Sequence, residues 1–269
     1  MATADGSVRP IAGPLPVWRW GAPDAPAFVL LHSLGLDGGS FRWLAHAMLS
    51  RANVQLIAPD MRGHGASLAA QTTINLADMA ADVTQLLQSL GIARAHLVGT
   101  SMGSAVARLA VALNPSLWTG ATLIAGGAGA VPALAQRGDA ALQGGMCAVV
   151  QETLGRWFPT ADIAHQEPFV QYARDCLLRM EPSAWAGAWR ALATYPAPGP
   201  LPAGVPGLCV AGELDTSATR DVVETMRQAA AVSPAVAVVP SAGHQLTMTH
   251  ARDAAALLLS HWHPLKAAQ

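Results

Sequence analysis

The sequence predicts an α/β protein with a mostly parallel central sheet, helices flanking it, and an all-helical cap. Short apolar runs alternate with amphipathic helical patterns through most of the chain, as in right-handed βαβ units. The alternation stops between about 127 and 200, where helical patterns follow one another without a strand. We therefore expect a core formed by residues 1–126 and 201–269, with residues 127–200 forming the cap.

Strands are predicted where apolar residues run together between turn signals, and for the first segment, Val17-Trp18-Arg19-Trp20, from an alternating pattern. The predicted strands are 17–20, 28–31, 54–58, 95–98, 121–125, 207–211 and 236–239. The first follows a segment rich in proline and glycine, so any N-terminal hairpin should be short. Helical spacing predicts helices over about 39–49, 75–90, 104–113, 139–156, 166–180, 182–194, 219–230 and 251–262. Asn75 is expected to cap its helix, and Gly91 to end it.

The composition suits a folded protein that acts on small molecules. Apolar residues make up 52% of the 269 and charged residues 12%, which favours one substantial core. The net charge of −1, without blocks of like charge, argues against nucleic-acid or membrane partners. The sequence has three widely spaced cysteines, an odd number, so we expect reduced thiols in the core at Cys147, Cys176 and Cys209. No signal-like or membrane-spanning stretch is evident. We expect a soluble, cytoplasmic monomer or small homo-oligomer.

The stretch Gly99-Thr100-Ser101-Met102-Gly103 follows an apolar strand and leads into a helix. A serine hydroxyl is a poor nucleophile at neutral pH, so a base and the substrate must both be able to reach it. A sharp turn at the end of a buried strand provides that exposure, and glycines two residues either side let strand and helix approach closely. Ser101 is the predicted nucleophile, and the N–H of Met102 is free to face an oxyanion.

The partners expected for Ser101 follow later strands. Ligands of parallel sheets gather beyond the carboxyl ends of the strands. Asp215 follows the strand over 207–211, and His244 follows the strand over 236–239. The order Ser, Asp, His is the one that a hydrolase of this topology requires. Glu213, two residues before Asp215, is the alternative acid.

These segments resemble the α/β-hydrolases over nearly the whole chain. The matching segments are L-L-H-S-L-G, D-M-R-G-H-G-A-S, L-V-G-T-S-M-G-S, A-G-E-L-D and S-A-G-H. The resemblance implies an α/β-hydrolase fold in which Ser101 attacks an acyl carbon, His244 transfers the proton and Asp215 orients the imidazole. It also implies an oxyanion hole formed by the backbone N–H groups of Leu34 and Met102. Neither a cofactor nor a metal is called for.

Within that fold the chain resembles the 3-oxoadipate enol-lactonases. The resemblance rests on H-S-L-G-L-D-G-G-S-F, D-M-R-G-H-G and two cap segments, L-Q-G-G-M-C-A-V-V-Q-E-T-L-G-R-W-F and M-E-P-S-A-W-A-G-A-W-R-A-L. The segment Q-L-T-M-T-H after His244 departs from that family's pattern. The resemblance implies an anionic lactone substrate. A general carboxylesterase, a C–C bond hydrolase and a non-catalytic binding protein of the same fold are the alternatives.

The cap supplies the residues expected to bind substrate. The candidates for an apolar pocket are Trp157, Trp185 and Trp189, with burial in the core of the cap as the alternative. Arg156 is the first candidate to pair with a substrate carboxylate, with solvation as the alternative for each cap arginine. Further cap arginines that could take this role are Arg174, Arg179 and Arg190. Several histidines have other interpretations. We expect His32 and His64 to have structural roles. A second group lies near the C-terminus and is expected to be solvated, with metal binding as the less favoured alternative: His250, His261 and His263.

Overall fold

A seven-stranded sheet forms the centre of the computed structural model, which describes residues 15–70 and 74–262. Its strands are β1 (Val17–Gly21), β2 (Ala27–Leu31), β3 (Gln55–Pro59), β4 (Ala95–Thr100), β5 (Trp118–Ile124), β6 (Gly207–Gly212) and β7 (Ala237–Val239). Their order across the sheet is β1-β3-β2-β4-β5-β6-β7. β1 runs antiparallel to β3, and the other neighbouring strands are parallel. The predicted α/β class with a mostly parallel sheet is confirmed.

The middle strands bring together the loops that carry the candidate site. β2, β3 and β4 are buried along their whole length. In the sheet, Gly99 of β4 pairs with Leu31 of β2 on one side and with Leu123 of β5 on the other. The loops after these strands therefore leave the sheet at the same level, next to one another.

The N-terminal strand β1 does not form a hairpin with β2, the strand that follows it in the sequence. β1 pairs with β3, from Val17 opposite Pro59 to Gly21 opposite Gln55, and not with β2. The reason is that β2 is already hydrogen-bonded on both sides, to β3 and to β4. The outer edge of β3 is the edge that β1 closes.

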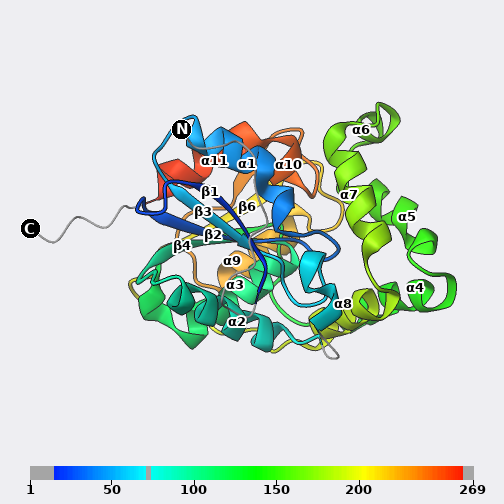
Figure 1. Cartoon of the computed structure of the whole chain (residues 1–269), viewed down its shortest axis with the longest axis horizontal. Helices are drawn as coiled ribbons and strands as arrows, with labels where there is room; N and C mark the ends of the chain where they lie inside the picture. The colour runs from blue at the N-terminus through cyan, green and yellow to red at the C-terminus, as the bar shows by residue number, and fades with distance from the viewer. Residues whose placement is uncertain (1–14, 71–73, 263–269) are drawn as a thin grey trace, which may run out of the picture.

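Helices cover both faces of the sheet (Figure 1). α1 (Arg42–Leu49), α10 (Leu246–Thr249) and α11 (Ala251–His261) lie on one face; α2 (Leu76–Ser89), α3 (Met102–Leu113) and α9 (Arg220–Ala229) lie on the other. The Asn75 side chain accepts a hydrogen bond from Ala77 N at 2.8 Å, and Gly91 has a φ of +67°. Both ends of α2 are therefore formed as predicted. Short 3-10 helices are η1 (Gly38–Phe41), η2 (Gly65–Ala70) and η3 (Pro115–Leu117).

Between β5 and β6 the chain forms a helical cap (Figure 1). Its helices are η4 (Pro132–Gly138), α4 (Asp139–Gly144), α5 (Cys147–Trp157), α6 (Thr160–Ala164), α7 (Pro168–Arg179) and α8 (Pro182–Thr194). The helix predicted over 139–156 is divided into α4 and α5. Gly145 lies between them with a φ of +70°, a conformation that ends a right-handed helix.

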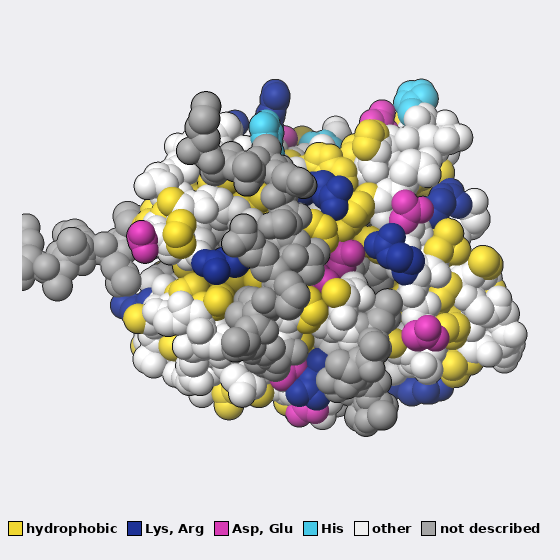
Figure 2. Space-filling view, in the orientation of Figure 1, with side chains coloured by type: hydrophobic (Ala, Val, Ile, Leu, Met, Phe, Trp, Pro, Cys, Tyr) yellow, Lys and Arg dark blue, Asp and Glu magenta, His cyan; other side chains and the backbone are white. Residues whose placement is uncertain are grey.

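A polar contact fastens α7 of the cap to the loop after β2. The hydroxyl of Tyr172 donates to Oδ1 of the buried Asp37, and Arg179 lies 3.6 Å from Oδ2 of the same carboxylate. The guanidinium of Arg42, from the core, stacks 4.2 Å above the Tyr172 ring. Figure 2 shows basic and acidic side chains among hydrophobic ones where the cap meets the core on this face. The cap is therefore held at this edge as well as by its two chain connections.

The three cysteines are free thiols. Cys176 and Cys209 are buried, but Cys147 is exposed, because it begins α5 on the outer surface of the cap. Among the described residues no helix is both long and apolar enough to cross a membrane.

Candidate active site

Ser101 occupies a strained turn between β4 and α3. Its φ of 54° and ψ of −115° lie in a region that residues with a side chain rarely adopt, at a cost of about 1–3 kcal/mol. The backbone holds it there, because Ser101 N donates to Ile124 O at 2.8 Å. The Ser104 hydroxyl donates to Ser101 O at 2.9 Å and to Ile124 O at 3.0 Å. Neighbouring β5 thus helps to fix the serine at the start of the helix.

Gly99 and Gly103 make this turn possible by close approach. A Cβ atom on Gly99 would lie 2.2 Å from Gly103 O, and one on Gly103 would lie 2.1 Å from Leu31 O. Both distances are far inside van der Waals contact. The backbones of β4, α3 and β2 therefore meet where only glycine fits, as the sequence pattern indicates.

His244 and Asp215 form a buried pair on the loops after β7 and β6. Nδ1 of His244 lies 2.8 Å from Oδ2 of Asp215, whose side chain is fully buried. The other carboxylate oxygen accepts from Ser217 N at 2.7 Å and Ala218 N at 2.9 Å. A carboxylate with these donors is oriented toward the ring, so it favours the tautomer with a proton on Nδ1. Nε2 is then available to accept a proton.

Glu213, the alternative acid, lies apart from His244. It is exposed, and its Oε2 accepts a hydrogen bond from Ser241 N at 2.8 Å. Ser241 itself has a φ of 58°. Glu213 therefore supports the turn that leads to His244, while Asp215 is the acid that contacts the ring.

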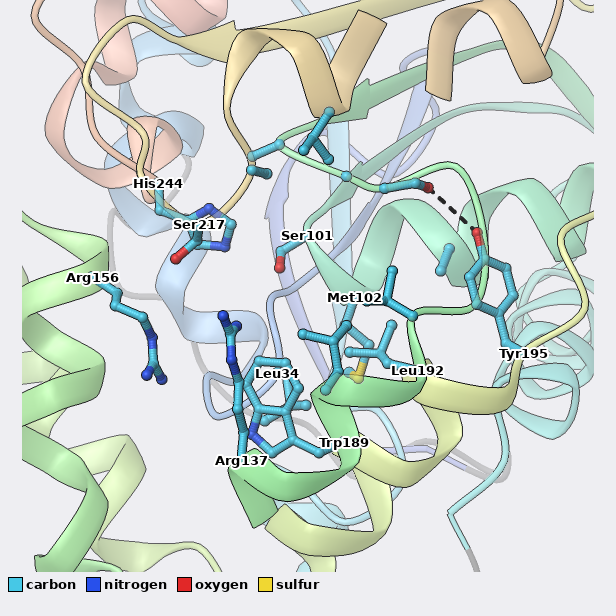
Figure 3. Close-up of a pocket in the computed structure, with 18 of the residues that line it drawn as sticks. Leu34, Ser101, Met102, Arg137, Arg156, Trp189, Leu192, Tyr195, Ser217 and His244 are labelled. Atoms are coloured by element: carbon cyan, nitrogen blue, oxygen red, sulfur yellow. Dashed lines mark hydrogen bonds between the residues drawn. The ribbon is translucent and has the colours of Figure 1, made fainter. Parts of the chain in front are cut away.

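A cavity of about 240 Å³ opens at the carboxyl ends of the strands, and both Ser101 and His244 line it. Leu34 and Met102 line it as well, and both are labelled in Figure 3. Met102 is the first residue of α3, so its N–H has no acceptor within the helix. The structure thus brings four of the predicted residues, Ser101, His244, Leu34 and Met102, to one cavity, with Asp215 behind His244.

The cap forms the opposite wall of the cavity. Trp157, Trp189, Leu192 and Tyr195 line it, so two of the three predicted tryptophans face the site. Trp185 does not line it. Its side chain is fully buried in the cap, where Nε1 donates to Arg137 O at 3.2 Å. Trp185 packs edge to face against Trp189 and so supports the wall from behind.

Two arginines reach the cavity from the cap, Arg156 as predicted and Arg137 in addition. Figure 3 shows both guanidinium groups in the space between the cap and the residues Ser101 and His244. Burial, together with the charge of Arg137, lowers the pKa of Arg156. Arg156 is bonded to Glu152, and Arg137 lies 5.0 Å above the Trp189 ring. Two cations thus face one cavity.

Arg137 was missed by sequence reasoning because it lies in the short helix η4, where no periodic pattern marks a side chain as facing inward. The other cap arginines lie elsewhere. Arg179 pairs with Asp37, Arg190 lies 3.6 Å from Asp139, and neither these two nor Arg174 lines the cavity.

His32 and His64 lie behind the site and have structural partners. Nε2 of His32 accepts from Met61 N at 3.0 Å, so its Nδ1 donates to Ser33 O at 2.9 Å. Nδ1 of His64 donates to Arg62 O at 2.9 Å, and the two rings are 5.0 Å apart. Burial lowers the pKa of His32 to about 4 and that of His64 to about 3. Both rings are neutral at pH 7, and His32 joins the loops that follow β2 and β3.

No group of three or more possible metal ligands occurs among the described residues. His250 and His261 are bonded to Thr249 and Ser260 of their own helical segments. His263, the remaining histidine of the alternative metal site, lies outside the described residues.

Comparisons with known proteins agree with this architecture. A family model described as alpha/beta hydrolase fold matches residues 26–251. 3-Oxoadipate enol-lactonase 1 of Acinetobacter baylyi is 28% identical over 220 residues, which are 77% of this chain and 78% of that protein. The crystal structure of the enol-lactonase from Burkholderia xenovorans LB400 superposes with a TM-score of 0.80 at 26% identity, covering 95% of this chain and 99% of that one.

A further relative matches over a shorter segment. The magnesium-chelatase 30 kDa subunit of Rhodobacter capsulatus is 38% identical over 104 residues. That segment is 38% of this chain, and it spans only 36% of the length of the subunit.

Proposed function

The chain belongs to the alpha/beta hydrolase fold family, and on that premise we propose that it is a serine hydrolase that cleaves a small carboxylic ester or lactone. One observation carries the proposal: Ser101 and His244 line the same cavity, and His244 is bonded to the buried Asp215. These are the nucleophile, base and orienting acid of a catalytic triad, and they arise from three separate loops.

The first half of the reaction forms an acyl-enzyme. Ser101 Oγ attacks the acyl carbon while Nε2 of His244 takes the hydroxyl proton. The negative charge that develops on the substrate oxygen is stabilised by the N–H groups of Leu34 and Met102. Asp215 stabilises the imidazolium, which then gives its proton to the leaving alcohol or enol oxygen. For a lactone the leaving oxygen stays attached to the acyl group, so nothing is released at this stage.

Water completes the cycle in the second half. His244 removes a proton from a water molecule, which attacks the acyl carbon, and the returning proton regenerates the Ser101 hydroxyl. The product is a carboxylic acid. Apart from the substrate and this water molecule, every group that takes part in these steps belongs to the chain.

For the substrate we favour an enol lactone that bears a carboxylate, such as 3-oxoadipate enol-lactone. The cavity is small, its wall is apolar where Trp157, Leu192 and Leu34 line it, and it contains the two cations Arg137 and Arg156. A carboxylate placed between two guanidinium groups can accept charge-assisted hydrogen bonds from both. The two enol-lactonases among the relatives support the same substrate class.

Labelling with a fluorophosphonate probe tests the serine chemistry. Wild-type protein should be labelled at Ser101, and Ser101→Ala should not be. An unlabelled wild type, or equal labelling of Ser101→Ala, would refute the triad and favour the rival class, a binding protein that keeps the fold without catalysis.

A substrate panel tests the bond and the charge. The values of kcat/KM for 3-oxoadipate enol-lactone, its methyl ester and a neutral aryl acetate should fall in that order. Loss of a charge-assisted pair costs about 1.5–3 kcal/mol, or roughly ten- to over a hundred-fold in rate. If the neutral ester has the highest kcat/KM, the proposed lactonase activity is wrong and the protein is a general carboxylesterase. A vinylogous diketone completes the panel, and preference for it would indicate a C–C bond hydrolase.

A further inference from the structure

Arg108 is a fully buried arginine in the middle of α3, the helix that begins directly after Ser101. It is only 1% exposed. Within residues 15–70 and 74–262, no carboxylate forms an ion pair with it, and its Nε has no hydrogen-bond partner. An unpaired buried charge is costly, and arginine is rarely found in such a place without a partner. The groups that it does contact therefore indicate what it does.

The guanidinium of Arg108 joins the two segments that connect the cap to the core. Nη1 donates to Ala128 O at 2.6 Å, on the segment that leads from β5 into the cap. Nη2 donates to Pro198 O at 2.6 Å, on the segment that returns from α8 toward β6. Arginine suits this task because its planar fork can bind two separate acceptors with fixed geometry.

Tyr195 adds a second link between the same two segments. Its hydroxyl accepts from Nη1 of Arg108 at 3.4 Å and donates to Gly127 O at 3.4 Å. Figure 3 shows the bond from Tyr195 to the neighbouring loop at one end of the cavity. Gly127 and Tyr195 both line the cavity, so the joined segments are also part of its wall.

We propose that Arg108 is a positioning residue that holds the two cap connections at a set separation and thereby sets the width of the cavity at the Tyr195 end. It acts through two backbone carbonyls and the Tyr195 hydroxyl, and it touches neither the triad nor the substrate. The expectation that cavity width limits the size of the substrate rests on the proposed esterase or lactonase function. The connection between the two segments is independent of that function, since it depends only on the contacts of Arg108.

Arg108→Met tests the proposal by removing both donors while keeping an unbranched apolar side chain. Hydrogen–deuterium exchange should rise by about tenfold for amides in 126–131 and 195–200, with little change in α5 and α7. For an aryl ester with an acyl chain that fills the cavity, KM should rise about tenfold while kcat changes less than about threefold. For aryl acetate both constants should stay near the wild-type values.

Arg94→Met is the matched control. Arg94 also donates to a backbone carbonyl, Trp118 O at 3.2 Å, but it precedes β4 at the far end of the sheet from the cavity. Its substitution should change neither the exchange of the two segments nor KM. Arg108→Lys, which keeps the charge and can reach one carbonyl, should restore part of the wild-type KM.

Two outcomes would overturn the proposal. Exchange in Arg108→Met that is unchanged in both segments, or raised equally through the whole chain, would mean that Arg108 does not join the connections. A fall in kcat with KM unchanged would mean that it acts on Ser101. If Arg108→Met does not fold, Arg108→Lys and Tyr195→Phe are measured instead. Tyr195→Phe removes the bond to Gly127 O, so hydrogen–deuterium exchange at Gly127 should be faster than in wild type. A wild type without hydrolase activity would contradict the proposed function and leave the exchange comparison valid.

Discussion

His244 Nδ1 lies 2.8 Å from Asp215 Oδ2, and the second oxygen of that carboxylate is held by the amides of Ser217 and Ala218. The carboxylate therefore cannot turn away from the ring without losing both amide bonds. This rigidity makes the acid the most informative position for testing the proposed triad.

Asp215→Asn should lower kcat by about 10⁴-fold, because an amide nitrogen facing Nδ1 favours the wrong imidazole tautomer. Glu213→Gln is the matched control and should have a small effect, since Glu213 faces Ser241 N and solvent. Turnover of the same ester by the two variants is the measurement. The reverse ranking would mean that Asp215 is not the acid.

Arg137→Ala and Arg156→Ala should each lower kcat/KM for the carboxylated lactone by roughly ten- to a hundred-fold and leave a neutral aryl acetate nearly unaffected. The reason is that each removes one of the two cations that line the cavity. Arg174→Ala serves as the control, because Arg174 belongs to the cap but lies outside the cavity lining. Equal losses on charged and neutral substrates would contradict a carboxylate site.

Gly103→Ala should lower the free energy of unfolding by about 1–3 kcal/mol. The reason is that the added Cβ would lie 2.1 Å from Leu31 O in the neighbouring strand. Gly155→Ala provides the contrast. Gly155 is an exposed helical glycine with nothing within 4 Å of an added Cβ, so alanine should stabilise α5 by about 0.5–1 kcal/mol. Urea unfolding of both variants compares the two free energies. Equal stability would show that the close approach at the turn is not needed.

The free energy of unfolding should fall as the pH is lowered below about 6.5. Burial holds the pKa of His64 at about 3 and that of His32 at about 4, against an ordinary value of 6.5. Below pH 6.5 the unfolded chain therefore binds protons that the native protein does not, and each histidine removes about 1.4 kcal/mol per pH unit. Asp60 acts in the opposite direction between about pH 6 and 4, because burial raises its pKa to about 6.

The contribution of one histidine can be isolated by substitution. The slope of unfolding free energy against pH from 6.5 to 4.5 should be shallower in His64→Asn than in wild type. His165→Asn, on the exposed surface of the cap, should keep the wild-type slope. If all three slopes coincide, His64 is not protected from protonation in the native state.

Most of the core architecture could be predicted from local sequence. The apolar run at 28–31 forms a buried strand, because a strand buried on both faces needs an apolar run. The strand predicted at 95–98 is also buried, and its one polar side chain, His96, is hydrogen-bonded to Thr122 Oγ1 at 2.9 Å. The turn at Ser101 was also predictable, since two glycines flank the serine at the spacing that close packing of strand and helix requires. Both features depend on residues that are neighbours in the chain.

What the sequence by itself determined was the α/β class, the parallel sheet, the strained turn and the order of the reactive residues. Only the tertiary structure decided which acid faces His244, that Arg137 reaches the cavity and Trp185 does not, and that β1 pairs with β3. The physical reason is that these relationships join distant segments. The direction of a side chain in a loop or in the cap depends on how the cap packs on the core, and no periodic pattern in the sequence records that packing.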